Sequence, residues 1–319
     1  MLPPINYFGG KARIAPTIWK HFGKPTAYIE CFSGMAATLL QRPDDSYPST
    51  QYWETINDID SVVANFHRSC QLAPEAVVSN ALDPPIEIEL LHREGVLSKS
   101  RERLRLMLED SKYHEPELAG WYLYVQANSI RPTPCIGTRT AKKPPLQPKG
   151  ALSPSQRDDI FEVFDKLSKR IQHLRILCRD YRDLLVDAEV KVPKGHTVAV
   201  LCDPPYKKPG KKYANGTFDY APLLKRCVEL GRHKNIRIAL CGYVGDYNMP
   251  EDWKVDPCFK TAGGHETVWY SPGCKKPEDS NHWENKGVVG NVFEEMYAEP
   301  PHHPLERVLS ILRREEVEE

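Results

Sequence analysis

An unbroken apolar run from Thr197 to Cys202 ends abruptly at Asp203-Pro204-Pro205-Tyr206. Continuous apolar runs are typical of parallel strands buried on both faces, so this run predicts an interior strand of an α/β sheet. Ligands of such sheets bind beyond the carboxyl ends of the strands, which is where this tetrad lies. A second Asp-Pro-Pro copy, starting at Asp83, follows no apolar strand and lacks the tyrosine, so we interpret it as a turn between helices.

The groups of the tetrad fit an amino group carried by a planar ring. The two prolines lack N–H donors and stiffen the backbone, so carbonyl oxygens in the Pro204–Pro205 region can face a ligand. Asp203 adds a carboxylate acceptor, and Tyr206 adds a flat aromatic face. We therefore expect a ligand amine to donate to Asp203 and to one of these carbonyl oxygens while its ring stacks on Tyr206.

The remaining strand-like runs predict a doubly wound, mostly parallel, Rossmann-like α/β sheet. Residues 27–32 and 52–56 form the first two expected strands, with a Ser33-Gly34 turn and a helix over 35–40 between them. Helices are expected over 62–70 and 157–171. Residues 174–178 and 236–241 predict the third and fifth strands, on either side of the tetrad strand in the sequence, and residues 267–270 predict part of a terminal hairpin.

Helical and irregular sequence replaces the strand pattern between residues 72 and 152. A segment of this length predicts an inserted helical subdomain over 72–152, with a catalytic domain made from residues 1–71 and 153–300. Residues 301–319 are rich in glutamate and predict an acidic helix or tail. Within the insertion, Trp121, Tyr122 and Tyr124 are expected in the hydrophobic core.

Basic residues are unevenly distributed along a chain whose formal net charge is zero. Residues 128–150 contain five lysines and arginines and no acidic residue, and a second basic segment begins with Lys207 and Lys208. A single lysine run usually indicates solvated surface. Two basic segments, one of them adjoining the candidate site, favour a surface that binds phosphates.

The cysteines indicate a reducing compartment. There are nine, an odd number, and several lie in apolar runs: Cys31, Cys178, Cys202 and Cys241. Buried, reduced thiols explain this usage best. The sequence shows no secretory signal and no stretch long enough to span a membrane, so we expect a cytoplasmic protein of a prokaryote or of a phage-infected cell.

A metal site is not expected. The nearest candidate set of ligands is Cys258, His265, Cys274 and His282. Their spacing matches no zinc pattern and contains no Cys-x-x-Cys pair.

In their order along the chain, these motifs resemble the Dam-type DNA adenine-N6 methyltransferases. The segment from Tyr7 to Lys11 resembles the family's aromatic-x-Gly-Gly-Lys motif, and the segment from Glu30 to Ala36 resembles its cofactor loop, with Ala36 in place of the usual second glycine. Asp58 resembles the acidic residue for the ribose, Asp180-Tyr181 the pair beside the cofactor's adenine, and the tetrad the catalytic signature. The resemblance covers about residues 1–70 and 170–275. The insertion at 72–152 resembles the family's target-recognition subdomain by position only.

The resemblance implies an adenine-specific, site-specific DNA methyltransferase that uses S-adenosyl-L-methionine and flips its target adenine out of duplex DNA. The implied cofactor-binding residues are Tyr7, Lys11, Glu30, Phe32, Ser33, Gly34, Asp58, Asp180 and Tyr181. The implied catalytic residues are Asp203, Pro204, Pro205 and Tyr206. Residues expected to contact double-stranded DNA are Asn128, Arg131, Lys207 and Lys208. No membrane partner is expected, and a partner restriction endonuclease is left open.

The residues themselves leave alternatives, because the pocket recognises an amino group on a ring without specifying the ring. Cytosine-N4 methylation and RNA adenine methylation are therefore alternatives. A catalytically silent nucleic-acid-binding module on the same fold is another; Asp203 and Tyr206 argue against it, and Ala36 is the only feature in its favour. A nucleotide-binding dehydrogenase is disfavoured because the loop after the first strand lacks Gly-x-Gly-x-x-Gly.

Overall fold

The structure is a computed structural model of the 319-residue chain. It describes residues 1, 3–5, 10–48, 51–83, 95–128, 154–186, 190, 195–206, 218–256, 259–261 and 264–276. At residues 127–128, 154–156, 259–261 and 264 it describes the backbone alone.

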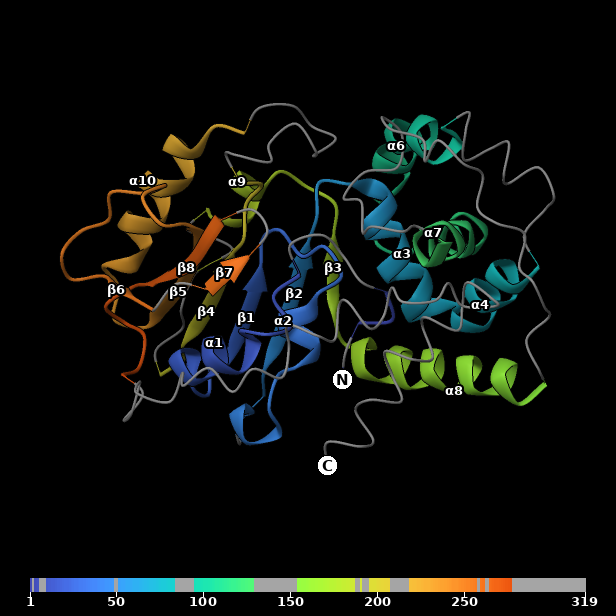
Figure 1. Ribbon diagram of the computed structural model, residues 1–319, viewed down its shortest axis with the longest axis horizontal. Helices are drawn as coiled ribbons and strands as arrows, with labels where there is room; N and C mark the ends of the chain where they lie inside the picture. Colours follow the sequence, from blue (N-terminus) through green and yellow to red (C-terminus); the bar gives the residue numbers. More distant parts are fainter. Residues whose placement is uncertain are drawn as a thin grey trace.

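Eight strands form one sheet in the order β3-β2-β1-β4-β5-β8-β6, with β7 paired to β8 (Figure 1). The strands are β1 Ala27–Glu30, β2 Trp53–Asn57, β3 Arg175–Leu177, β4 Val198–Cys202, β5 Ile236–Tyr243, β6 Lys254–Val255, β7 Phe259–Thr261 and β8 Gly264–Tyr270. Strands β1 to β5 pair in parallel, and β8 is antiparallel to β5, β6 and β7. The predicted doubly wound, mostly parallel Rossmann-like sheet is confirmed.

The last strand departs from the prediction for residues 267–270. It does form a hairpin with β7, but it also lies inside the main sheet between β5 and β6. This placement makes β8 a neighbour of the strands that follow the tetrad, and a local sequence pattern does not reveal it.

The helices agree with the expected alternation of strands and helices. They are α1 Ala15–Phe22, α2 Ala37–Leu40, α3 Ser61–Leu72, α4 Pro74–Leu82, α6 Val96–Met107, α7 Pro116–Asn128, α8 Pro154–Ile171, α9 Tyr181–Leu184 and α10 Tyr220–Gly231, with a short 3-10 helix at Asp44–Ser46. Aspartates begin three of them: the carboxylates of Asp60, Asp180 and Asp219 each accept a hydrogen bond from a backbone N–H in the first turn of α3, α9 and α10.

Side chains on the two faces of the sheet enter two separate hydrophobic cores. On β4, Ala199 and Leu201 join the core that contains α1, α2 and α3, whereas Val198 and Val200 join the core that contains α9 and α10. Successive strand residues point to opposite faces, so this alternation decides which tip residues can meet.

Helices α4, α6 and α7 of the insertion pack beside the β3 edge of the sheet together with α3 and α8 (Figure 1). Their buried residues belong to the same core as α1 and α3, with Leu104 and Leu123 fully buried. Tyr122 and Tyr124 are buried and Trp121 packs against this core, which confirms the prediction for these aromatic residues.

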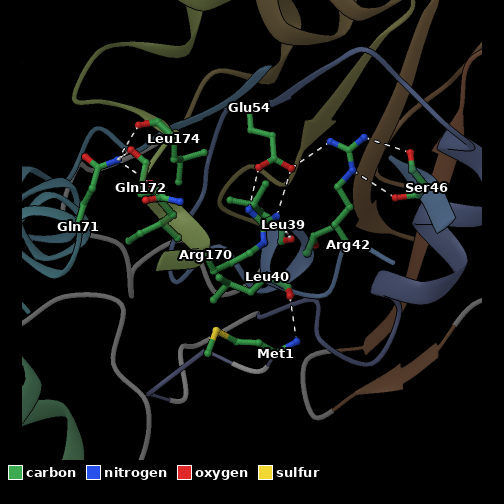
Figure 2. Close-up of polar contacts among 12 residues, drawn as sticks. Met1, Leu39, Leu40, Arg42, Ser46, Glu54, Gln71, Arg170, Gln172 and Leu174 are labelled. Atoms are coloured by element: carbon green, nitrogen blue, oxygen red, sulfur yellow. Dashed lines mark hydrogen bonds and ion pairs between the residues drawn. The ribbon is translucent and has the colours of Figure 1, made fainter. Parts of the chain in front are cut away.

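A buried charge network anchors the amino end of β2 (Figure 2). Glu54 accepts hydrogen bonds from Arg42 at 3.0 Å and from Arg170 of α8 at 2.8 Å. The side chain of Arg42 is completely buried and also donates to the Ser46 hydroxyl. Because two guanidinium groups satisfy one buried carboxylate, the network joins β2 to α8 and to the segment that follows α2.

The described cysteines are all free thiols: Cys31, Cys70, Cys178, Cys202, Cys227, Cys241 and Cys274. All are buried except Cys178, which is partly exposed. Within the described ranges, no helix is both long and apolar enough to cross a membrane.

Candidate active site

The loop after β1 turns tightly through two residues with left-handed backbone conformation. Gly34 has a φ of 47° and Ala36 a φ of 54°, and Ala36 is the one described non-glycine residue with positive φ. The Ala36 N–H donates to the Ser33 carbonyl at 2.7 Å. Helix α2 therefore begins at Ala37, two residues later than predicted, because the chain needs Met35 and Ala36 to complete the turn.

The carboxylate of Asp58, the residue directly after β2, is hydrogen-bonded to this loop. One carboxylate oxygen accepts from the Gly34 N–H at 2.9 Å, and the other accepts from the Asp60 N–H at 2.9 Å. Burial, together with the nearby Asp60 charge, raises the pKa of Asp58 to about 7. The acidic residue that was predicted from the end of the second strand thus lies against the predicted loop, poised to change protonation near neutral pH.

Glu30, the last residue of β1, is buried and directly precedes the same loop. The Tyr28 hydroxyl donates to its carboxylate at 2.9 Å. Burial raises the pKa of Glu30 to about 8, and the charges of Asp203 and Asp58 add to the increase. Since both carboxylates act on Glu30, the tips of β1, β2 and β4 converge on one small volume.

Asn57 ties the three neighbouring strand ends together. Its side-chain amide donates to the Cys31 carbonyl at 3.0 Å and to the Arg179 carbonyl at 2.9 Å, and its oxygen accepts from the Arg179 N–H at 2.9 Å. Asn57 is buried, so these bonds are shielded from water. They fix the loops that carry Phe32 and Asp180 relative to each other.

The charged centre of the site joins the tetrad to the amino-terminal segment. Lys11 Nζ lies 2.8 Å from Asp203 Oδ2 and 3.8 Å from Glu266 Oε2. The Lys11 side chain is 5% exposed, and both carboxylates are 17% exposed. Burial lowers the pKa of Lys11, but the attraction of Asp203 and Glu266 more than offsets it, so the pKa lies above its ordinary value and the ammonium stays charged.

Tyr206 is buried beneath Lys11. Its ring centroid is 5.1 Å from Lys11 Nζ and 4.7 Å from the Tyr243 ring, which meets it edge-on. The residue is 4% exposed. Burial, with the Asp203 charge beside it, holds the pKa of the Tyr206 hydroxyl far above its usual range, so the group stays neutral.

The two proline carbonyls of the tetrad are in different environments. The Tyr220 hydroxyl of α10 donates to the Pro205 carbonyl. Pro204 is buried, and no described residue donates to its carbonyl oxygen. Of the two, Pro204 therefore offers the acceptor that the described residues leave open.

Aromatic rings line the tips of β1 and β3, which flank β2 in the sheet. The Phe32 ring lies 5.3 Å from that of Tyr181 and 5.6 Å from that of Phe218. Asp180 begins α9, and its carboxylate accepts from the Arg182 backbone and guanidinium, which lowers its pKa. The predicted Asp180-Tyr181 pair is thus beside the loop after β1, as the order of the strands requires.

The structure brings together most of the predicted site residues that it describes: Lys11, Glu30, Phe32, Ser33, Gly34, Asp58, Asp180, Tyr181 and the tetrad. Tyr7, Arg131, Lys207 and Lys208 lie outside the described residues, as does the side chain of Asn128. In the part of the chain that is described, no group of three or more His, Cys, Asp or Glu side chains is arranged to hold a metal ion.

Several residues of the site were not predicted, among them Asn57, His67, Tyr220, Tyr243 and Glu266. Asn57 and Tyr243 end strands, so their position at a strand tip was a usable signal. His67 lies in a helix and Glu266 in the antiparallel strand, where no local pattern distinguishes them from ordinary core or surface residues.

Comparison with known proteins leaves the family undetermined. No protein-family model matches the sequence, and no curated protein matches it. A solved structure described as "Putative methyltransferase yhhF from Escherichia coli" is similar over 85% of this chain and 92% of that chain, with 11% identity and a TM-score of 0.34. A TM-score this low carries no argument about function, so the functional conclusion rests on the site itself.

Proposed function

We propose that the protein transfers a methyl group from S-adenosyl-L-methionine to the N6 amino group of an adenine flipped out of duplex DNA. The observation that carries this proposal is the convergence of the tetrad, Glu30 and Asp58 at one edge of the sheet. A carboxylate acceptor, an open carbonyl and an aromatic ring lie at the tip of β4, and two acidic residues and a tight turn lie at the tips of β1 and β2.

The loop after β1 fits the proposed cofactor. The Ser33 hydroxyl is buried and has no hydrogen-bond partner among the described residues, as expected of a group that a ligand satisfies. Asp58 and Glu30 supply carboxylates for ribose hydroxyls and for a cationic group. Phe32 and Tyr181 supply apolar faces for a planar ring, with Asp180 beside them.

S-adenosyl-L-methionine supplies an electrophilic methyl group attached to a sulfonium. On the protein side, Asp203 and the Pro204 carbonyl would each accept one N–H of the target amine. Two acceptors on one amine draw its hydrogens out of the ring plane and localise the nitrogen lone pair toward the methyl donor. The Asp203 carboxylate also stabilises the positive charge that develops on the nitrogen as the bond between sulfur and methyl group breaks. The leaving group would be the neutral thioether, and the proton that the methylated nitrogen loses would pass to solvent.

Tyr220 leaves the Pro204 carbonyl, and not the Pro205 carbonyl, as the acceptor for the amine. Because its hydroxyl already donates to the Pro205 carbonyl, that oxygen is directed toward α10 and away from the proposed amine. The bond also holds the Pro204–Pro205 segment against α10, which keeps the open carbonyl in place.

A DNA substrate is proposed on the strength of the two basic segments, 128–150 and the one that begins at Lys207. We propose that Arg131, Lys207 and Lys208 contact phosphates and that Asn128 contacts a base edge. Neutralising Lys207 and Lys208 together should then weaken binding to all DNA sequences and flatten its dependence on salt.

The test is incubation of the purified protein with methyl-labelled S-adenosyl-L-methionine and either duplex DNA or RNA, followed by nucleoside analysis. Label in N6-methyladenine from DNA is the expected result. Label only in N4-methylcytosine, or only in RNA, would show that the substrate is cytosine or RNA and not adenine in DNA. If the folded protein transferred no methyl group to any nucleic acid, the proposal would be overturned.

A further inference from the structure

The Lys11 ammonium occupies the place on Asp203 that an incoming amino group would need. Its nitrogen lies 2.8 Å from Asp203 Oδ2, which is hydrogen-bond distance, and it also lies over the ring of Tyr206. Asp203 has a second oxygen, but the Tyr206 ring is covered by Lys11 and flanked by Tyr243. A base that stacks on Tyr206 therefore has to displace Lys11.

A second partner for the ammonium is already in place. Glu266 Oε2 lies 3.8 Å from Lys11 Nζ, which is close enough for attraction but too far for a hydrogen bond. Glu266 comes from β8 and is paired across the sheet with Tyr243 of β5. Lysine is a flexible point charge, so a short movement of its side chain would make the hydrogen bond to Glu266 and release Asp203.

We propose that Lys11 is a positioning residue that holds Asp203 until the target base arrives and then moves onto Glu266. This proposal rests on the function proposed above and deepens it. The movement exchanges one amine for another on Asp203: the ammonium leaves, and the amino group of the base takes its place.

Glu266 matters to this exchange because the Lys11 side chain is charged when it leaves Asp203. Burial lowers the pKa of Lys11, but Asp203 and Glu266 together hold it above its ordinary value, so the side chain is an ammonium before the exchange. Drawing a buried ammonium away from a carboxylate opposes entry of the base. With Glu266 as the new partner, the Asp203 charge is free to stabilise the amine during transfer.

The test measures base flipping separately from chemistry. The DNA sequence that the protein methylates is first identified by methylation-sensitive sequencing of DNA treated with the wild-type protein. The target adenine is then replaced by 2-aminopurine, whose fluorescence increases when the base leaves the stack. Wild type, Glu266→Gln, Lys11→Met and the double variant are compared for this fluorescence, for single-turnover rate, for S-adenosyl-L-methionine affinity and for melting temperature. Glu162→Gln, an exposed pair with Lys166, is the matched control.

Glu266→Gln should weaken the flipping signal and slow single-turnover transfer by roughly 10- to 100-fold, with unchanged affinity for S-adenosyl-L-methionine. Lys11→Met should flip the base at least as well as wild type, and adding Glu266→Gln to it should change flipping no further. A normal flipping signal in Glu266→Gln, or the same loss with and without Lys11, would overturn the exchange. Either of these two outcomes can be read only if the wild-type protein methylates DNA. A wild-type protein that transfers no methyl group to DNA would instead contradict the proposed function itself.

Discussion

His67 Nε2 lies 2.7 Å from the carbonyl oxygen of Gly34, so a helix of the first core holds the turn of the candidate cofactor loop. The bond requires the tautomer with hydrogen on Nε2, because a carbonyl can only accept. Burial lowers the pKa of His67 to about 4, so the ring is neutral at pH 7.

Stability should therefore depend on pH through His67. In the unfolded chain His67 takes up a proton below about pH 6.5, whereas in the folded chain it does so only below about pH 4. The neutral ring therefore contributes about 3 kcal/mol to the free energy of unfolding above pH 6.5, and this contribution is lost as the pH falls toward 4. Glu30 and Asp58, whose pKa values are raised, act in the opposite direction. Urea unfolding of wild type and His67→Gln isolates the histidine: the advantage of wild type should shrink between pH 7 and pH 4.5. Parallel stability curves would contradict the assignment.

The left-handed conformation of Ala36 predicts an unusual response to glycine. Such a conformation costs an alanine about 1–2 kcal/mol, which glycine does not incur, although glycine loses the packing of a buried methyl group. Ala36→Gly should thus be close to neutral or stabilising. The matched change Ala37→Gly, in the first position of α2, should destabilise by about 1 kcal/mol. Equal losses at the two positions, measured by urea unfolding, would show that the turn is not strained.

Binding of S-adenosyl-L-methionine should release protons and strengthen as the pH rises from 6 to 8. The reason is that a cationic ligand favours the ionised forms of Asp58 and Glu30, whose pKa values are about 7 and about 8. Asp58→Ala should weaken binding by about 1.5–3 kcal/mol. Calorimetry of wild type and Asp58→Asn in buffers of different ionisation enthalpy measures the released protons, and the difference between the two proteins cancels the titration of the ligand. Equal proton release by both would remove Asp58 from the site.

The Glu54 network should be a major source of stability. Glu54→Gln leaves Arg42 and Arg170 without their buried carboxylate and should destabilise the fold by about 3–5 kcal/mol (Figure 2). The exposed Glu162→Gln change should have little effect. Chemical unfolding measures both, and a small loss for Glu54→Gln would mean that the network contributes no more than a surface pair.

The parallel strands could be predicted because each is a short apolar run that ends at polar residues. The Thr197–Cys202 run located β4 within one residue, and the runs at 27–32 and 174–178 located β1 and β3 but overran their ends. Parallel strands bring their carboxyl ends to one edge, so the convergence of Glu30, Asp58 and Asp203 followed from strand order alone.

The ion pairs of the site could not be predicted in the same way. Lys11 and Asp203 meet because α1 covers the sheet face toward which Asp203 points, and Glu266 joins them because β8 lies antiparallel beside β5. Both are results of tertiary packing between distant segments. The left-handed backbone conformation of Ala36 could not be predicted from the sequence either, because alanine favours the helix that the surrounding residues predicted.

Single-turnover methylation of duplex DNA by wild type and variants of Asp203 and Tyr206 tests the central claim most directly. Wild type should yield N6-methyladenine, and folded Asp203→Ala should yield none. Tyr206→Phe should keep much of the activity, whereas Tyr206→Ala should lose the roughly 1–3 kcal/mol that stacking of a base on an aromatic ring contributes. A methylated cytosine as the product, or full activity in folded Asp203→Ala, would contradict the account.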